Sequence, residues 1–190
     1  KKVLSACLEM DNEGYELLTL NGSWARERHM EFSKLRHGIQ GVESLRGVSS
    51  HQAQPFLALT TPDVGQDRGE VYAFHFVYSG NFSARAELTQ FDTVRMTMGI
   101  HPDGFEWTLA PGESFTAPEV VCVYSDRGLG AMTRTFHDLY RNHLIRSPYL
   151  HRKRPVLINY WEARYFDFDK EGLLEMARGA KEVGVEMLVM

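Results

Sequence analysis

The spacing of apolar residues changes near residue 125, and this change limits what the chain can fold into. Before it, residues 94–100 alternate apolar and polar side chains, which is typical of a strand with one buried face. Residues 71–78 and 82–88 flank a Ser-Gly-Asn turn and predict a hairpin. Further strands are expected at residues 15–20, 105–109 and 120–124, the last of them buried. Short strands at this spacing indicate a β-sandwich over residues 1–124.

After residue 125 the apolar period becomes helical. Leu129, Met132 and Phe136 fall on one face, which predicts an amphipathic helix over residues 125–146. Ser125 or Asp126 can cap its first turn. We expect this helix to link the sandwich to a second domain.

Residues 147–190 predict a β-α-β unit. The apolar runs 156–158 and 185–190 suit strands buried on both faces, and an amphipathic helix lies between them. Asp167 or Asp169 can cap that helix, and Gly184 can end it. A unit of this length requires a parallel sheet. Because two strands and one helix cannot cover themselves, we expect the chain to be a piece of a longer protein.

Composition excludes several classes of protein. The chain is 43% hydrophobic and 24% charged, which excludes disorder, and no apolar run reaches the roughly 20 residues that span a bilayer. A net charge of −4 argues against nucleic acid as a partner. Cys7 and Cys122 form no CxxC motif, and buried free thiols are favoured over a disulfide. No metal site is expected, and His137 and His143 are spaced unfavourably for sharing a metal.

The most promising functional residues follow the first strand of the β-α-β unit. Active sites of parallel α/β proteins lie at the carboxyl ends of strands, and Asn159, Tyr160 and Trp161 occupy such an end. Trp161 can stack on a sugar ring or can be a core residue at the rim. Glu162 can be a catalytic carboxylate, although an ion pair with Arg164 is the favoured interpretation.

Other candidates have simpler structural explanations. His51 follows two serines, but no GxSxG elbow supports a catalytic triad. Trp24 and Trp107 are expected in the core or in an interface. Residues 26–29 alternate in charge and predict a solvated surface.

Several motifs resemble those of glycoside hydrolase family 36 α-galactosidases. The stretch R-P-V-L-I-N-Y-W-E-A-R-Y-F-D-F at residues 154–168 resembles the motif that opens the catalytic barrel of that family. Residues 184–190, G-V-E-M-L-V-M, resemble the segment that normally continues into D-D-G-W. Upstream, residues 18–28, 46–56 and 124–132 resemble further family motifs, so the resemblance covers nearly the whole chain.

The resemblance implies a fold and an activity. It implies that residues 1–124 are part of a galactose-mutarotase-like β-supersandwich, that residues 125–146 are a linker helix, and that residues 147–190 start a (β/α)8 barrel. The parent protein is then a retaining α-galactosidase acting on α-galactosides of the melibiose and raffinose type, without cofactor or metal. A homo-oligomer, a tetramer in this family, is expected, with no membrane partner. The location is expected to be cytoplasmic, and a secreted form stays open.

The resemblance also carries over site residues. The family Trp that lines the galactose pocket corresponds to Trp161, with Asn159 and Tyr160 as neighbours. Tyr160 and Arg164 depart from the family's usual Asn and Thr. The family's catalytic aspartates lie on later barrel strands, so no catalytic residue is assigned, and this polypeptide alone is expected to be inactive.

Two alternatives stay open. The first is a non-catalytic carbohydrate-binding or oligomerisation β-sandwich. The second is a family relative, such as an α-N-acetylgalactosaminidase or a raffinose synthase.

Overall fold

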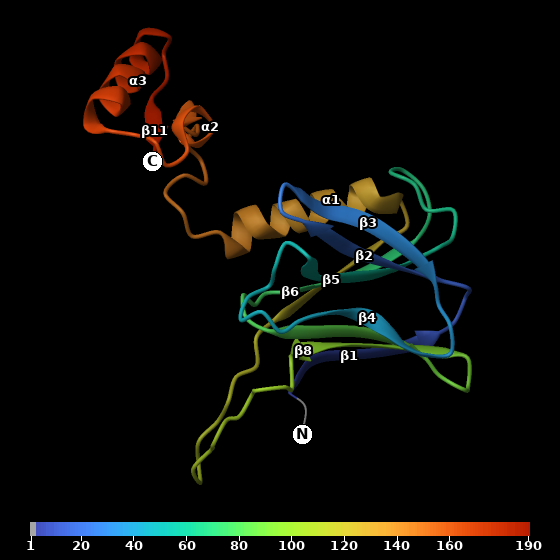
Figure 1. The fold of residues 1–190 in the computed structure, drawn as a ribbon. Coiled ribbons are helices and arrows are strands. Elements are labelled where there is room, and N and C mark those ends of the chain that lie inside the picture. The colour runs from blue at the N-terminus through green and yellow to red at the C-terminus, as the bar shows by residue number, and fades with distance from the viewer. Residues whose placement is uncertain (1–2) are drawn as a thin grey trace. The chain divides into compact units, whose positions relative to one another are not determined.

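The computed structural model describes residues 3–190, and the chain divides into two compact units. The first unit ends at Leu139, and the second covers Tyr140–Met190. The first is mainly β, as the alternating pattern before residue 125 predicts (Figure 1). None of the helices within residues 3–190 is both long and apolar enough to cross a membrane.

Two antiparallel sheets build the first unit. One has the strand order β1-β8-β7-β4, and the other has the order β3-β2-β5-β6-β9. The strands are β1 (Leu4–Asp11), β2 (Glu16–Ser23), β3 (Arg26–Lys34), β4 (Gly38–Ser44), β5 (Ala53–Thr60), β6 (Val71–Phe76), β7 (Phe82–Leu88), β8 (Thr93–Ile100) and β9 (Val120–Ser125).

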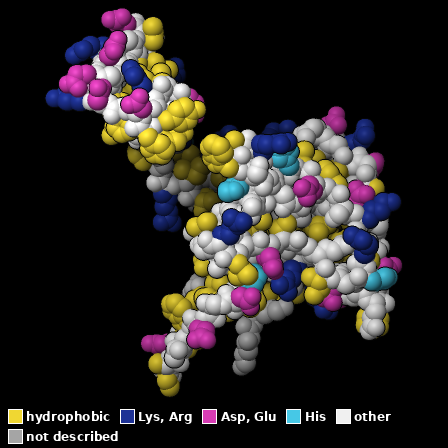
Figure 2. All heavy atoms as spheres, viewed as in Figure 1, with side chains coloured by type: hydrophobic (Ala, Val, Ile, Leu, Met, Phe, Trp, Pro, Cys, Tyr) yellow, Lys and Arg dark blue, Asp and Glu magenta, His cyan; other side chains and the backbone are white. Residues whose placement is uncertain are grey.

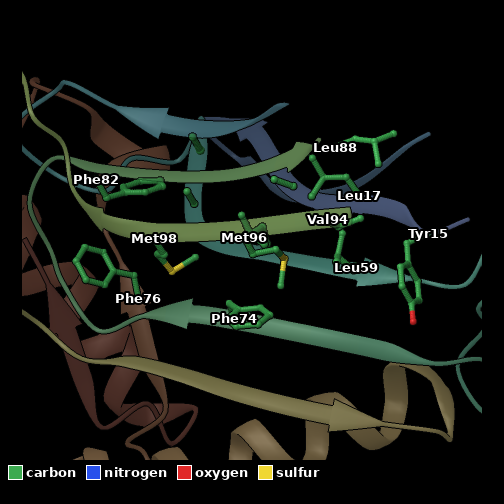
Figure 3. Close-up of a cluster of buried hydrophobic side chains, with 14 of the residues drawn as sticks. Tyr15, Leu17, Leu59, Phe74, Phe76, Phe82, Leu88, Val94, Met96 and Met98 are labelled. Atoms are coloured by element: carbon green, nitrogen blue, oxygen red, sulfur yellow. The ribbon is translucent and has the colours of Figure 1, made fainter. Parts of the chain in front are cut away.

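The hydrophobic core lies between the two sheets. Val94, Met96 and Met98 of β8 are almost fully buried, whereas Arg95 and Thr97 between them are only partly covered. Their side chains meet those of the five-stranded sheet, among them Leu59, Phe74 and Phe76 (Figure 3). The period of two in the sequence therefore separates a core face from a solvent face.

The predicted hairpin over residues 71–88 is wrong. β6 and β7 belong to different sheets, so the Ser-Gly-Asn turn carries the chain from one layer of the sandwich to the other. β7 forms a hairpin with β8 instead, where Phe82 pairs with Ile100 and Leu88 with Val94. Local turn chemistry cannot separate these outcomes, because a turn residue fits a hairpin and a crossing between sheets equally well.

Residues 105–109 form no strand, which corrects a second expectation. Residues 101–119 lie outside the two sheets and form an arm whose tip extends away from the sandwich (Figure 1), whereas His101 is buried and Phe105 and Phe115 pack against the core. Trp107 packs on Phe115 with ring centroids 5.0 Å apart, yet it remains 62% exposed. Trp24 is 79% exposed, so neither Trp is a core residue of this unit. Hydrophobic and acidic side chains both appear on the arm (Figure 2).

β9 is an edge strand of the five-stranded sheet and is only partly buried, which corrects the expectation of a buried strand. Cys122 lies on it and is exposed, and Cys7 on β1 is exposed too. Both are free thiols, as favoured, but neither is a buried one. An edge position leaves one side of β9 unpaired, which the apolar run V-V-C-V-Y does not reveal.

The linker helix is shorter than predicted. α1 covers Gly128–Leu139, and a π-helical turn, η1 (Tyr140–Leu144), follows it. Ser125 Oγ accepts from the backbone N–H of Arg127 at 3.1 Å and donates to the carbonyl of Gly128, so it organises the turn before the helix. Phe136 of α1 lies over Phe56 of β5, with ring centroids 6.3 Å apart. The helix therefore covers the outer face of the five-stranded sheet.

A charged cluster lies on the outer face of the other sheet. Arg85 Nη2 donates to Glu43 Oε2 at 3.2 Å, and Nε2 of the buried His101 lies 3.2 Å from the same oxygen. Burial raises the pKa of Glu43, but the contacts with Arg85 and His101 outweigh it, so this pKa is lowered overall.

The second unit is the predicted β-α-β arrangement. β10 (Leu157–Asn159) and β11 (Met187–Val189) pair in parallel, and α2 (Trp161–Arg164) and α3 (Lys170–Glu182) lie between them in sequence. Asp169 Oδ1 accepts from Gly172 N at 2.8 Å and caps α3, which decides between the two candidate caps. Gly184, with φ +86°, follows the end of α3 as predicted.

Candidate functional site

The candidate site begins where β10 ends. β10 and β11 run in parallel, with Asn159 opposite Val189, and Tyr160 N continues the ladder by donating to Val189 O at 3.1 Å. Directly after this bond the chain turns into α2. The three predicted residues therefore occupy the carboxyl edge of a parallel strand pair, where α/β proteins place ligands.

Asn159 fixes the turn into α2. Its Oδ1 accepts from the backbone N–H of Trp161 at 2.9 Å, so the side chain satisfies a donor at the start of the helix. Leu157 and Asn159 are exposed, whereas Ile158 between them is partly buried. Asn159 thus lies on the more open face of β10, and its amide nitrogen is available to a ligand.

Tyr160 is a packing residue in this unit. It is 6% exposed, and its ring lies 5.0 Å from that of Phe168 in an edge-to-face arrangement. Aromatic pairs favour this geometry. The Tyr160 side chain therefore supports the loop from inside the unit, and it affects the open face of the site only by positioning the residues around it.

Trp161 lies in a group of three aromatic side chains, which we call the aromatic rim: Trp161, Tyr165 and Phe166. The Trp161 ring is 5.4 Å from the Tyr165 ring and 4.9 Å from the Phe166 ring, both edge-to-face. Trp161 is partly buried, while Phe166 is 84% exposed. In an edge-to-face pair the edge of one ring covers a face of the other, so the surface open to an apolar ligand is the exposed part of the group, which lies mainly on Tyr165 and Phe166.

Backbone geometry holds the aromatic rim in place. Tyr165 has φ 49°, which is uncommon for a residue with a side chain, and its N–H donates to Trp161 O at 2.7 Å. This bond closes α2 and turns the chain back. The sequence shows the letters Y-F-D-F but not this reversal, so Tyr165 and Phe166 were not predicted as site residues.

The remaining candidates do not join this site. Within residues 3–190, no ion pair links Glu162 to Arg164, which corrects that prediction, and Glu162 is exposed. The described residues include no group of His, Cys, Asp or Glu side chains that could hold a metal, and His51, His137 and His143 are exposed. The site is thus an aromatic platform with one amide, suited to binding rather than to acid-base chemistry.

Comparisons with known families cover nearly the whole chain. The glycosyl hydrolase family 36 N-terminal domain matches residues 1–110, and the melibiase family matches residues 114–190. Both matches agree with the sequence motifs.

Named relatives give the same picture. Alpha-galactosidase AgaA of Geobacillus stearothermophilus is 50% identical over 189 residues, which are 100% of this chain and 26% of AgaA. The bifunctional alpha-galactosidase/sucrose kinase AgaSK of Mediterraneibacter gnavus is 42% identical over 190 residues, 100% of this chain and 20% of that protein. The chain thus spans about a quarter of the length of AgaA.

Solved structures show the same fold. The crystal structure of AgaA superposes with a TM-score of 0.94 at 50% identity, over 98% of this chain and 26% of that chain. A structure of an AgaA variant in complex with raffinose gives a TM-score of 0.95 at 49% identity, over 100% and 26% of the two chains.

Proposed function

Because the chain belongs to glycosyl hydrolase family 36, we propose that the whole protein is a retaining α-galactosidase. It hydrolyses terminal α-D-galactosyl residues of melibiose- and raffinose-type sugars. The relatives named alpha-galactosidase support this proposal, and one of their structures holds raffinose. The observation in this chain that carries it is the aromatic rim at the carboxyl end of β10, where a barrel enzyme holds its substrate.

In this proposal the chain supplies binding and not bond cleavage. A retaining glycosidase uses two carboxyl groups about 5–5.5 Å apart, one as nucleophile and one as acid and base. The resemblance assigns both to later strands of the barrel. Trp161 presents an apolar ring to the galactosyl group, Asn159 offers an amide for a hydroxyl, and Tyr160 supports the loop. We expect the 190-residue polypeptide alone to show no turnover.

The test uses the full-length protein and a nitrophenyl α-galactoside. Trp161→Ala should lower kcat/KM about tenfold or more through a raised KM, because one stacking ring is lost. Trp24→Ala is the matched control, since Trp24 is 79% exposed on the sandwich. Equal kcat/KM for both variants would show that Trp161 is not part of the substrate site. Turnover of an α-N-acetylgalactosaminide, or galactosyl transfer to sucrose, in place of hydrolysis would replace the proposed activity.

We also propose the domain division implied by the family motifs. Residues 1–124 belong to the β-supersandwich, residues 125–146 form the linker, and residues 147–190 begin the catalytic barrel. The exposed apolar side chains of the second unit support further strands and helices packing on it, among them Val156, Leu157, Phe166 and Met187. Limited proteolysis of the full-length protein should cut between α1 and β10 before it cuts within the strands of the sandwich.

We further propose that the whole protein forms a homo-oligomer, a tetramer, and that it is located in the cytoplasm. The arm 101–119 supports self-association, because an unpaired segment with exposed Trp107 and Leu109 gains from being covered by another copy. Sedimentation of the full-length protein should show a tetramer, and Trp107→Ser should weaken it. A monomeric wild-type protein would end this part of the proposal.

A further inference from the structure

A surface cavity of about 440 Å³ lies on the outer face of the four-stranded sheet, in the first unit. It forms where β1, β4, β7 and β8 meet the turn between β7 and β8. Its lining residues are Glu9, His37, Gly38, Glu87, Leu88, Thr89, Gln90, Phe91 and Arg95. The volume falls within the range of small-ligand sites, and none of these residues belongs to the aromatic rim.

A row of three charged side chains forms one wall of this cavity. Arg95 stands opposite Glu9 across one strand pair and opposite Glu87 across the other. Its Nε donates to Glu9 Oε2 at 2.9 Å, and its Nη1 donates to Glu87 Oε2 at 3.4 Å. The guanidinium is thus held flat between two carboxylates, which fixes the directions of its remaining donors.

The charges of this row select against anions. Two carboxylates and one guanidinium leave a formal charge of −1 on the three side chains, so a phosphate or carboxylate ligand is repelled. All three side chains are between 37% and 47% exposed, so their free oxygens and N–H groups can reach a ligand. Paired acceptors and donors at fixed positions suit vicinal hydroxyl groups, which both donate and accept.

Phe91 also lines the cavity, and its ring packs little against the rest of the fold. Phe91 lies at the tip of the turn and is 78% exposed. The turn itself is rigid: Thr89 Oγ1 accepts from the N–H groups of Phe91 at 3.2 Å and of Thr93 at 3.3 Å. Asp92, with φ 59°, accepts at Oδ1 from Asn12 Nδ2 at 2.8 Å, which ties the turn to the segment after β1. The backbone that carries Phe91 is therefore ordered before a ligand binds, which lowers the entropic cost of binding.

We propose that this cavity is a second carbohydrate-binding site, which takes a neutral sugar ring between Phe91 and the Glu9–Arg95–Glu87 row. The apolar face of the sugar lies on the Phe91 ring, and its hydroxyl groups bond to the charged row. The site holds a neutral oligosaccharide on the sandwich and changes no covalent bond.

Saturation-transfer NMR on the full-length protein tests the proposal, with maltotriose, which carries no galactosyl group, as the probe and inorganic phosphate as the anionic control. At millimolar concentrations maltotriose should bind and phosphate should not. Phe91→Ala should weaken sugar binding about tenfold, as expected for one lost aromatic contact. Arg95→Lys should weaken it too, because a compact ammonium lacks the planar guanidinium that spans Glu9 and Glu87 with donors in fixed directions.

Two controls separate this site from others on the chain. Trp24→Ala removes an equally exposed ring from the other sheet, and Trp161→Ala alters the aromatic rim, so neither should change the affinity for maltotriose. The proposal is overturned if maltotriose does not bind, if Phe91→Ala binds it as tightly as wild type, or if Trp161→Ala abolishes its binding. Thermal melts of each variant establish that it is folded. Failure here leaves the α-galactosidase proposal intact, since that is decided by turnover in the full-length protein.

Discussion

Replacing Phe82 with alanine removes a ring that is 0% exposed between the two sheets. Phe82 is the first residue of β7 and pairs with Ile100 of β8, and its side chain points toward the five-stranded sheet (Figure 3). An aromatic side chain buries about 200 Å² of surface, which at about 25 cal/mol per Å² gives an upper bound of about 5 kcal/mol. Alanine keeps part of this burial and the cavity that remains adds to the loss, so the total cost is about 3–5 kcal/mol.

That loss is a large part of the stability of a domain, which is typically about 5–15 kcal/mol. For a unit of this size the melting temperature should fall by about 12–20 °C. Urea unfolding followed by far-UV circular dichroism measures the cost directly, because the midpoint shifts while the slope stays the same.

Phe91→Ala is the matched control, because it makes the same change on the same hairpin at a residue that is 78% exposed. It should alter the free energy of unfolding by no more than about 0.5 kcal/mol. A cost below about 1 kcal/mol for Phe82→Ala, or equal costs for the two variants, would refute the placement of the core between the sheets.

The remaining predictions concern a helix cap and an acid-sensitive pair. Asp169→Ala should destabilise the second unit by about 0.5–2 kcal/mol, because Gly172 N loses its acceptor, whereas Asp167→Ala should have little effect; equal losses in urea unfolding would contradict the cap. Glu43 has a lowered pKa in the folded protein. Its contribution to the free energy of unfolding is therefore present above the unfolded glutamate pKa of about 4.3 and is lost as the pH falls through the folded pKa. In Glu43→Gln the urea midpoint should depend less steeply on pH over this acidic range, and an unchanged dependence would refute this contribution.

Alternation predicted the strands themselves better than it predicted their partners. Residues 94–100 lie in β8 with the expected buried face, because alternation with a period of two shows directly which side chains lie on the same face of a strand. The sequence could not show that β7 pairs with β8 and not with β6, since a turn carries no information on the sheet that follows it. The strand expected at residues 105–109 fails for a related reason: apolar side chains predict burial, yet Trp107 and Leu109 are exposed.

The candidate site, too, could be predicted only in part from the sequence. The sequence placed Asn159 and Trp161 at the end of a parallel strand, because the β-α-β pattern fixes that edge. It could not show that Tyr165 and Phe166 join Trp161, which depends on one backbone reversal at Tyr165. The Glu9–Arg95–Glu87 row could not be predicted either. It depends on the register between β1 and β8, which are far apart in the sequence.

The pairing of β1 with β8 also affects when β1 can fold during synthesis. Leu8 lies opposite Met96, so the ribosome must add nearly all of the sandwich before β1 finds its neighbour. At about 5–20 residues per second, synthesis leaves β1 waiting for several seconds. During that interval its backbone donors and acceptors are open to any other strand. A chaperone that holds the emerging β1 segment would therefore raise the yield of folded protein more than one that acts after release.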